Sequence, residues 1–304
     1  MKHFSTFIIC IFYCIAGYGQ ENKGIAALMT EANKYKNQPL YAVYLLQADS
    51  VAETAGDKTN RAVIHEKLGI YHFSRDAAKS IEHYNRAFKF YTELGKHKKA
   101  AFCSNNIAFV FDEGMHDDKQ ALEAGQKALQ LWQQQGDTMQ QANMYKYIGL
   151  LQGRLGQYAP AKLSIDTAIR LFTAQNFIKG VAVSYFDMAN VLLEEKDTHG
   201  AIANLEKAKT IWQQYGDSTR IYTVNTIMLK ALCHARKKEK AKQVLAENLS
   251  IEQAMNIYWS NRLDFYKEAE VYAALVKKEK ELYELKAKRQ SLSDSLTNAG
   301  IAIQ

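Results

Sequence analysis

The chain has 304 residues, with 39 Lys and Arg against 32 Asp and Glu and a formal net charge of +7. It contains only two prolines and no Pro-rich or Ser/Gly-rich stretch, so no linker is visible and one continuous body is favoured. Sustained apolar/polar alternation and Asn-Gly or Asp-Gly turns are missing, which argues against a sheet. The abundance of Ala, Leu, Lys, Gln, Glu and Tyr instead predicts an all-α protein.

The first nineteen residues have the order of a secretory signal peptide. A short basic start at 1–3 precedes an apolar run at 4–16, and Gly17 and Gly19 supply small residues for cleavage after Gly19. We therefore predict a signal peptide over 1–19 and an exported protein, periplasmic or associated with the cell envelope. The alternative is a buried first helix in an intracellular protein. About a dozen apolar residues are too few for a membrane span, which needs roughly 20, so none is expected in the mature chain.

The basic excess gathers late in the chain, between residues 237 and 289. A basic face is one signature of nucleic-acid binding, but an exported protein seldom meets nucleic acid. A solvated face is the better interpretation, and no nucleic-acid partner is expected.

Small residues recur with a period of about forty. One series, at intervals of 39, 41, 40 and 40, is Ala48, Ala87, Ala128, Ala168 and Ala208. Eight residues after each member comes a residue pair typical of a helix C-terminus: Gly56-Asp57, Gly95-Lys96, Gly136-Asp137, Asn176-Phe177 and Gly216-Asp217. A second series with the same period is Gly69, Ala108, Gly149, Ala189, Leu229 and Ala269. The two registers predict two helices per unit that approach closely at small residues. This register places Ala168 in the core and Lys209 in water.

The best-preserved unit reads Tyr145-x2-Ile148-Gly149 and then Ala161-x3-Ile165-x2-Ala168. This pattern resembles the tetratricopeptide repeat (TPR) family, in the long-repeat variant seen in exported bacterial sensor and regulator proteins, because forty exceeds the usual repeat of roughly 34 residues. The resemblance implies a right-handed superhelical α-solenoid of about seven helical hairpins. It gives a repeat domain over 20–298 and a C-terminal tail over 299–304.

Motifs for chemistry are missing from the sequence. It has no His-Glu-x-x-His, no Cys-x-x-Cys, no phosphate-binding Gly-rich loop and no Gly-x-Ser-x-Gly elbow. Of the eight histidines, His3 belongs to the basic start, and the other seven fall at turns or singly on the expected helices. We therefore expect no catalytic residue, no metal and no cofactor, and predict a protein that acts by binding another protein or peptide.

In proteins of this resemblance, the first helix of each hairpin lines a concave binding groove. Carried over, this gives nine candidate groove residues: Phe102, Asn105, Phe109, Lys146, Leu150, Phe186, Asn190, Thr226 and Lys230. Aromatic and aliphatic groups beside a few Asn and Lys suit an extended peptide or a helix. The alternative is that the three phenylalanines are simply core. Recognition of a free C-terminus is doubtful, because Leu150 stands where a carboxylate clamp would want Asn one turn after Lys146.

The C-terminal region allows two interpretations. A heptad seam favours one long helix that could self-associate, along Val271, Leu275, Lys278, Leu282, Leu285, Arg289, Leu292 and Leu296. The forty-residue register instead predicts a turn at 276–280 and a last helix from about Glu279 to Leu296, and the charges of Lys278 and Arg289 in the seam favour this turn.

The leading interpretation of function is an exported scaffold that serves as the sensory or input module of a signalling system. A structural assembly factor of the cell envelope is the alternative, and an intracellular regulator with an uncleaved first helix is a third.

Overall fold

The computed structural model describes residues 24–298. The signal peptide predicted over 1–19 and the tail predicted over 299–304 therefore lie outside the described residues. All regular structure in residues 24–298 is helical, which confirms the predicted fold class. The chain divides into two compact units, one ending at Leu131 and the other beginning at Trp132.

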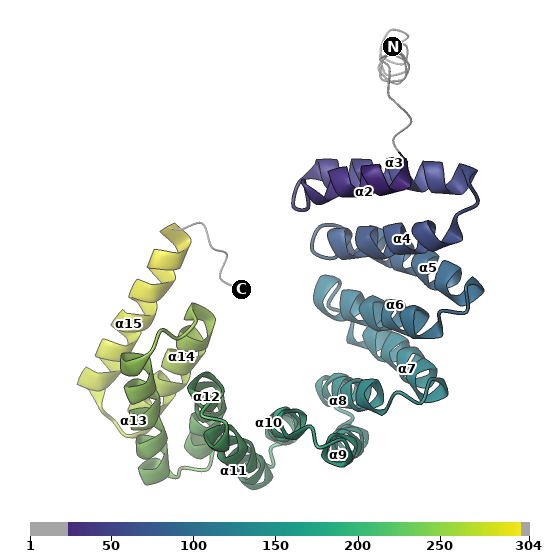
Figure 1. Ribbon diagram of the computed structural model, residues 1–304. Coiled ribbons are helices and arrows are strands. Elements are labelled where there is room, and N and C mark those ends of the chain that lie inside the picture. Colours follow the sequence, from purple (N-terminus) through teal and green to yellow (C-terminus); the bar gives the residue numbers. More distant parts are fainter. Residues whose placement is uncertain (1–23, 299–304) are drawn as a thin grey trace, which may run out of the picture. The chain divides into compact units, whose positions relative to one another are not determined.

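The helices follow one another with short connections (Figure 1). In the first unit they are α2 (Ile25–Asn33), α3 (Pro39–Thr54), α4 (Lys58–His72), α5 (Ala77–Glu93), α6 (His97–Phe109), the π-helical turn η1 (Val110–Gly114) and most of α7 (Asp118–Gln134). In the second unit they are α8 (Thr138–Arg154), α9 (Tyr158–Ala174), α10 (Ile178–Glu194), α11 (Thr198–Gln214), α12 (Ser218–His234), α13 (Lys238–Ala254), α14 (Trp259–Leu275) and α15 (Glu279–Asn298). Along residues 24–298, six pairs of successive helices pack as hairpins, α2/α3, α4/α5, α8/α9, α10/α11, α12/α13 and α14/α15. Helices α6 and α7 occupy the places of a seventh hairpin in the same order. The expected array of TPR-like hairpins is confirmed.

The small residues of both series lie at helix contacts, as the sequence predicts. All five alanines of the first series, from Ala48 to Ala208, are fully buried. In the second series, a Cβ on Gly69 would lie 2.8 Å from the ring of Tyr84, which is closer than any side chain tolerates. At this contact, α4 and α5 can approach closely only because Gly69 has no side chain.

The prediction for Lys209 is wrong. Its side chain is 18% exposed, and its Nζ lies 2.5 Å from Oε2 of Glu247 on α13. The periodic pattern identifies the apolar face of α11 but not a long side chain that folds over the next hairpin.

Left-handed residues end the helices where the sequence predicts. Gly56, Gly95, Gly136 and Gly216 have φ between 63° and 66°, and Asn176 has φ 53°. The following helix often begins with an aspartate cap, since the carboxylate accepts from a free backbone N–H of the first turn. Asp197, for example, accepts from the N–H of Gly200 at 2.9 Å.

The last hairpin turns at Val276–Lys278, so the predicted turn is confirmed and the single long helix is wrong. Lys277 takes the left-handed conformation there, with φ 59°. Of the two charged seam residues, Lys278 pairs locally with Glu281, and Arg289 binds Glu270 of α14 through Nε at 2.6 Å. Both charges are therefore satisfied within the hairpin.

Candidate functional site

The first helices of the hairpins in the second unit are α8, α10, α12 and α14. The structure packs α8 beside α10, α10 beside α12, and α12 beside α14. On each of these helices we take the residue of the second series as the reference, namely Gly149, Ala189, Leu229 or Ala269. The positions three residues before it and one residue after it repeat at forty-residue intervals. These positions lie on one side of α8, α10, α12 and α14, and we call the surface that they form with adjoining residues of the same helices the first-helix face.

Six of the nine predicted site residues lie on the first-helix face. Lys146, Leu150, Phe186, Asn190 and Lys230 are half-buried, whereas Thr226 is only 4% exposed. The hydroxyl of Thr226 donates to the carbonyl of Tyr222 at 3.0 Å and accepts from the amide of Asn248 at 3.3 Å. Thr226 is therefore part of the packed contact between α12 and α13, and little of it is available to a ligand.

The other three predicted site residues lie on α6 in the first unit. Phe102 is 42% exposed, so the alternative that places it in the core is wrong. Phe109 is half-buried, and Asn105 is buried with 7% exposure. On α4, one hairpin earlier, Ile70 occupies the repeat position of Phe109 and is 58% exposed. The sequence analysis did not select Ile70, although the forty-residue register would have found it.

An ion pair links two helices on the first-helix face. Nζ of Lys146 on α8 lies 3.5 Å from Oδ2 of Asp187 on α10. Asp187 is 7% exposed, and this burial raises the pKa of its carboxyl while the Lys146 ammonium opposes the rise. Lys146 therefore has a structural task besides any contact with a ligand.

A cavity of about 240 Å³ opens on the first-helix face between α12 and α14. We call it the α12–α14 cavity. Its wall is polar and carries both signs of charge, and the residues that line it are Thr223, Thr226, Ile227, Lys230, Asn261, Asp264, Lys267 and Glu268. Burial raises the pKa of the Glu268 carboxyl, with Lys230 and Lys267 acting in the opposite direction. Two of the predicted site residues, Thr226 and Lys230, thus reach a cavity whose other wall the sequence analysis missed.

A carboxylate of α13 joins the two helices that form this cavity. Glu252 near the end of α13 accepts from Arg262 Nε at 2.9 Å and from the hydroxyls of Tyr266 at 2.5 Å and Tyr222 at 3.3 Å. These bonds fix α14 against α12 across the connection that follows α13. The orientation of α14, and with it the far wall of the cavity, depends on this network.

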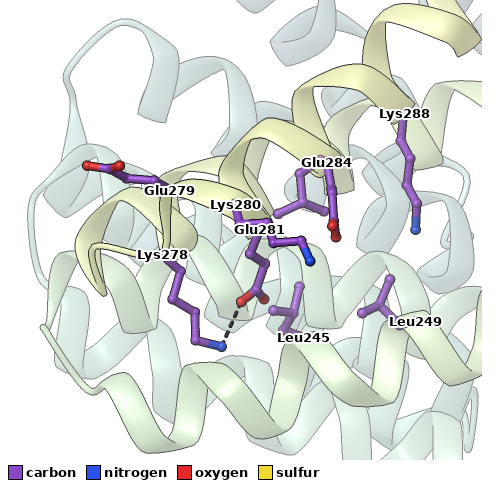
Figure 2. A pocket seen from close by; sticks show the side chains of 9 residues that line it. Leu245, Leu249, Lys278, Glu279, Lys280, Glu281, Glu284 and Lys288 are labelled. Atoms are coloured by element: carbon purple, nitrogen blue, oxygen red, sulfur yellow. Dashed lines mark hydrogen bonds and ion pairs between the residues drawn. The ribbon is translucent and has the colours of Figure 1, made fainter.

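A second hollow of about 600 Å³ lies between α13 and α15 (Figure 2). Leu245 and Leu249 of α13 project into it from one side, and Glu281, Glu284 and Lys288 of α15 border it on the other. It has an apolar floor and a rim on which lysines and glutamates alternate. Its charged rim offers no preference for one sign of charge.

Three histidines that the sequence analysis treated singly lie together in the first unit. His65 and His72 on α4 both stack on His83 of α5, with ring centroids 5.2 and 5.5 Å apart. Nδ1 of His65 lies 3.0 Å from Nδ1 of His83. Nevertheless, residues 24–298 contain no group of three or more His, Cys, Asp or Glu arranged to hold a metal ion. In the same part of the chain, no helix is long and apolar enough to cross a membrane.

The family model described as soluble NSF attachment protein, SNAP, matches residues 29–233, which is more than half of the chain. The chain belongs to the SNAP family. The matched region extends from α2 to the end of α12, and the TPR-like hairpins expected from the sequence are the repeat of this family. No curated protein matches the chain.

Solved structures similar to this SNAP-family chain are helical repeat proteins. The apo form of RapI has 14% identity and a TM-score of 0.65, and the match covers 90% of this chain and 99% of RapI. BtubC from P. vanneervenii has 17% identity and a TM-score of 0.62, covering 77% and 93%. A STAND protein with a tetratricopeptide repeat sensor, PH0952 from Pyrococcus horikoshii, has 15% identity and a TM-score of 0.67, covering 90% and 43%. At these identities the likeness shows the fold.

Proposed function

We propose that the chain is a non-enzymatic scaffold that binds a segment of a partner protein on the first-helix face of its second unit. The observation that carries the proposal is the run of half-buried side chains on four adjacent helices, which ends in the α12–α14 cavity. Leu150 and Phe186 supply apolar surface, while Asn190 and Lys230 supply polar groups that can set the register of a bound segment.

The comparisons support binding over catalysis. A Rap protein complexed with Competence and Sporulation Factor has a TM-score of 0.55 to this chain over 90% of its length. In that complex a helical repeat protein holds another molecule. The family description likewise names an attachment protein. Phe102 and Ile70 on the first helices of the first unit provide further exposed apolar surface of the same kind.

Export and a sensory role complete the proposal, with the input module of a signalling system as the leading role. Export rests on the order of residues 1–19, in which a basic start, an apolar run and small residues follow one another. Mass spectrometry of the protein isolated from cells tests it. We expect a mature chain that begins at or next to Gln20, and an intact Met1 would contradict export.

Site-specific photocrosslinking tests the binding face. A benzoylphenylalanine in place of Phe186 or Leu150 is expected to crosslink one partner in extracts of the producing cell. The matched control is the same group at Leu163 on α9, which is 66% exposed but lies on a second helix of a hairpin. Crosslinks from Leu163, with none from Phe186 or Leu150, would place the binding surface elsewhere.

A further inference from the structure

Two acidic residues of α14 stand at repeat positions that are apolar or small on the five preceding first helices, α4, α6, α8, α10 and α12. Asp264 of α14 stands five residues before Ala269, the second-series residue of that helix. At the same position the five preceding first helices carry buried residues, which are Ile64, Cys103, Met144, Ser184 and Val224. Glu268 stands one residue before Ala269. At that position the five preceding first helices carry apolar residues, which are Leu68, Ile107, Ile148, Met188 and Met228. These positions normally pack against a neighbouring helix, so two carboxylates there break the local packing rule. Such breaks are expected at functional sites.

The structure shows what replaces the missing packing. Asp264 and Glu268 lie one helical turn apart on α14, and both line the α12–α14 cavity opposite Thr223 and Lys230 of α12. In the earlier hairpins, Val224 and Met228 at these positions are 2% and 4% exposed. Where apolar side chains would close the space between first helices, the last pair leaves a polar opening.

Among residues 24–298, the charged groups that line this opening form no close ion pair with one another. Lys230, Asp264, Lys267 and Glu268 make no side-chain hydrogen bond or ion pair with another described residue. Glu268 is half-buried and Asp264 is exposed. Burial raises the pKa of the Glu268 carboxyl, while the charges of Lys230 and Lys267 oppose the rise. A cation that entered the cavity could contact the two carboxylates directly, which neither lysine does.

The two lysines that line the cavity do not remove its preference for a cation. Lys267 is exposed and repeats Lys67 of α4, and Lys230 occupies the surface position of Ile70 and Asn190. Lysine is ordinary at such positions, because its long chain can carry the ammonium into water. The carboxylates are the departure from the repeat, and the two lysines favour the ionised form of Glu268.

We propose that the α12–α14 cavity binds a basic side chain, lysine or arginine, with Asp264 and Glu268 as its counter-ions. The inference rests on the proposed function, since the side chain belongs to the segment held on the first-helix face. Asn261 and Thr223 offer further oxygen acceptors on the wall, which suits the several donors of a guanidinium or ammonium group. Helix α14 would thus fix the register of the bound segment.

Selection from a random peptide library displayed on phage tests this inference. The purified chain is compared with Asp264→Asn/Glu268→Gln, which keeps the shape of the wall, and with Asp166→Asn/Glu194→Gln. The last variant changes net charge equally at exposed acids of α9 and α10. We expect the unchanged chain to enrich Lys or Arg at one fixed peptide position. The cavity variant should lose this preference and bind the selected peptide roughly ten-fold or more weakly, while the control keeps both.

The outcomes separate the two proposals. Enriched peptides without a basic position, or a basic preference that survives in the cavity variant, would overturn the inference and leave the proposed function standing. Enrichment of no peptide by the unchanged chain would contradict both. If the double variant does not fold, judged by circular dichroism, Glu268→Lys provides the same test. It should change the selected residue at that position from basic to acidic, and an unchanged basic preference would overturn the inference.

Discussion

A Cβ atom placed on Gly149 would lie 2.5 Å from Cγ1 of Ile165, across the contact between α8 and α9. The carbonyl oxygen of Ala161 would lie 3.0 Å from it. Ile165 is fully buried, so it has no free space into which to retreat. The best-preserved hairpin therefore depends on a missing side chain at this position.

We expect Gly149→Ala to destabilise the protein. Alanine in place of glycine inside a helix favours folding by roughly 0.5–1 kcal/mol, but overpacking a tight core costs roughly 1–3 kcal/mol, so the loss dominates. Urea unfolding measures the change. In an Ile165→Ala background, where the obstructing side chain is gone, the same substitution should be neutral or stabilising. An equal loss in both backgrounds would show that Ile165 is not the cause.

The turns inside the hairpins give a second prediction. Gly156 takes φ 73° between α8 and α9, and the equivalent turns place Lys196, Arg236 and Lys277 at φ 70°, 54° and 59°. A left-handed conformation costs a residue with a Cβ roughly 1 kcal/mol or more. We expect Lys196→Gly to raise the thermal midpoint and Gly156→Ala to lower it. A lower midpoint for Lys196→Gly would mean that the lysine side chain stabilises the turn by more than its strain.

The third prediction concerns the ion pair of the first-helix face. Lys146→Met would leave the Asp187 carboxylate buried without its counter-ion, which we expect to cost about 1–3 kcal/mol, because Lys146 itself keeps partial contact with water. Lys146→Met/Asp187→Asn should recover most of that loss. Chemical denaturation at neutral pH measures both variants. Equal stability of the single variant and the unchanged protein would show that the pair is unimportant.

The same pair affects how binding is measured. Because Lys146 stabilises the fold, a binding defect in Lys146→Met alone would mix two effects. The Lys146→Met/Asp187→Asn variant separates the loss of stability from the loss of binding. It removes the charge of Lys146 and leaves no buried carboxylate without a counter-ion. Weaker binding by this double variant would assign Lys146 a contact with the partner.

The sequence predicts the array of hairpins because its signal is local and repeated. Small residues at fixed spacing and Gly or Asn at helix ends act within one hairpin, and both were confirmed at Ala168 and Gly136. Even the unmarked turn at Val276–Lys278 follows from the register alone. Where a lysine takes the left-handed conformation, as at Lys277, the sequence carries no local mark, because the fold imposes that geometry.

The candidate site was harder to predict, because it depends on pairs of helices. The bond network of Glu252 joins residues on three helices, and no periodic pattern identifies it. The histidines show the same difficulty: His65 and His83 stand eighteen positions apart, and only the rotation of α4 against α5 makes their rings face one another. The acidic wall of the α12–α14 cavity is different. Comparing Asp264 and Glu268 with their forty-residue equivalents would have revealed it from the sequence alone.

The histidine cluster gives the last prediction. Burial lowers the pKa of His65 to about 4, and it lowers the pKa of His72 and His83 as well. For His65, Arg61 on α4 and Arg86 on α5 act in the same direction, while Asp49 of α3, 3.5 Å from Nε2, opposes them. The 3.0 Å contact between Nδ1 of His65 and Nδ1 of His83 needs one ring to donate and the other to accept, so both rings cannot be protonated.

Protonation therefore favours the unfolded chain, in which histidine keeps its ordinary pKa of 6.5. Above that pH both states hold neutral rings and the cluster adds no pH dependence. As the pH falls from 6.5 toward 4, the unfolded chain takes up protons that the folded chain refuses, so we expect stability to fall through this window. Urea midpoints measured between pH 7.5 and pH 4 test this. The dependence should weaken in His65→Gln/His83→Gln and persist in His97→Gln, which alters an exposed histidine. An equal dependence in all three proteins would assign the acid sensitivity to other groups.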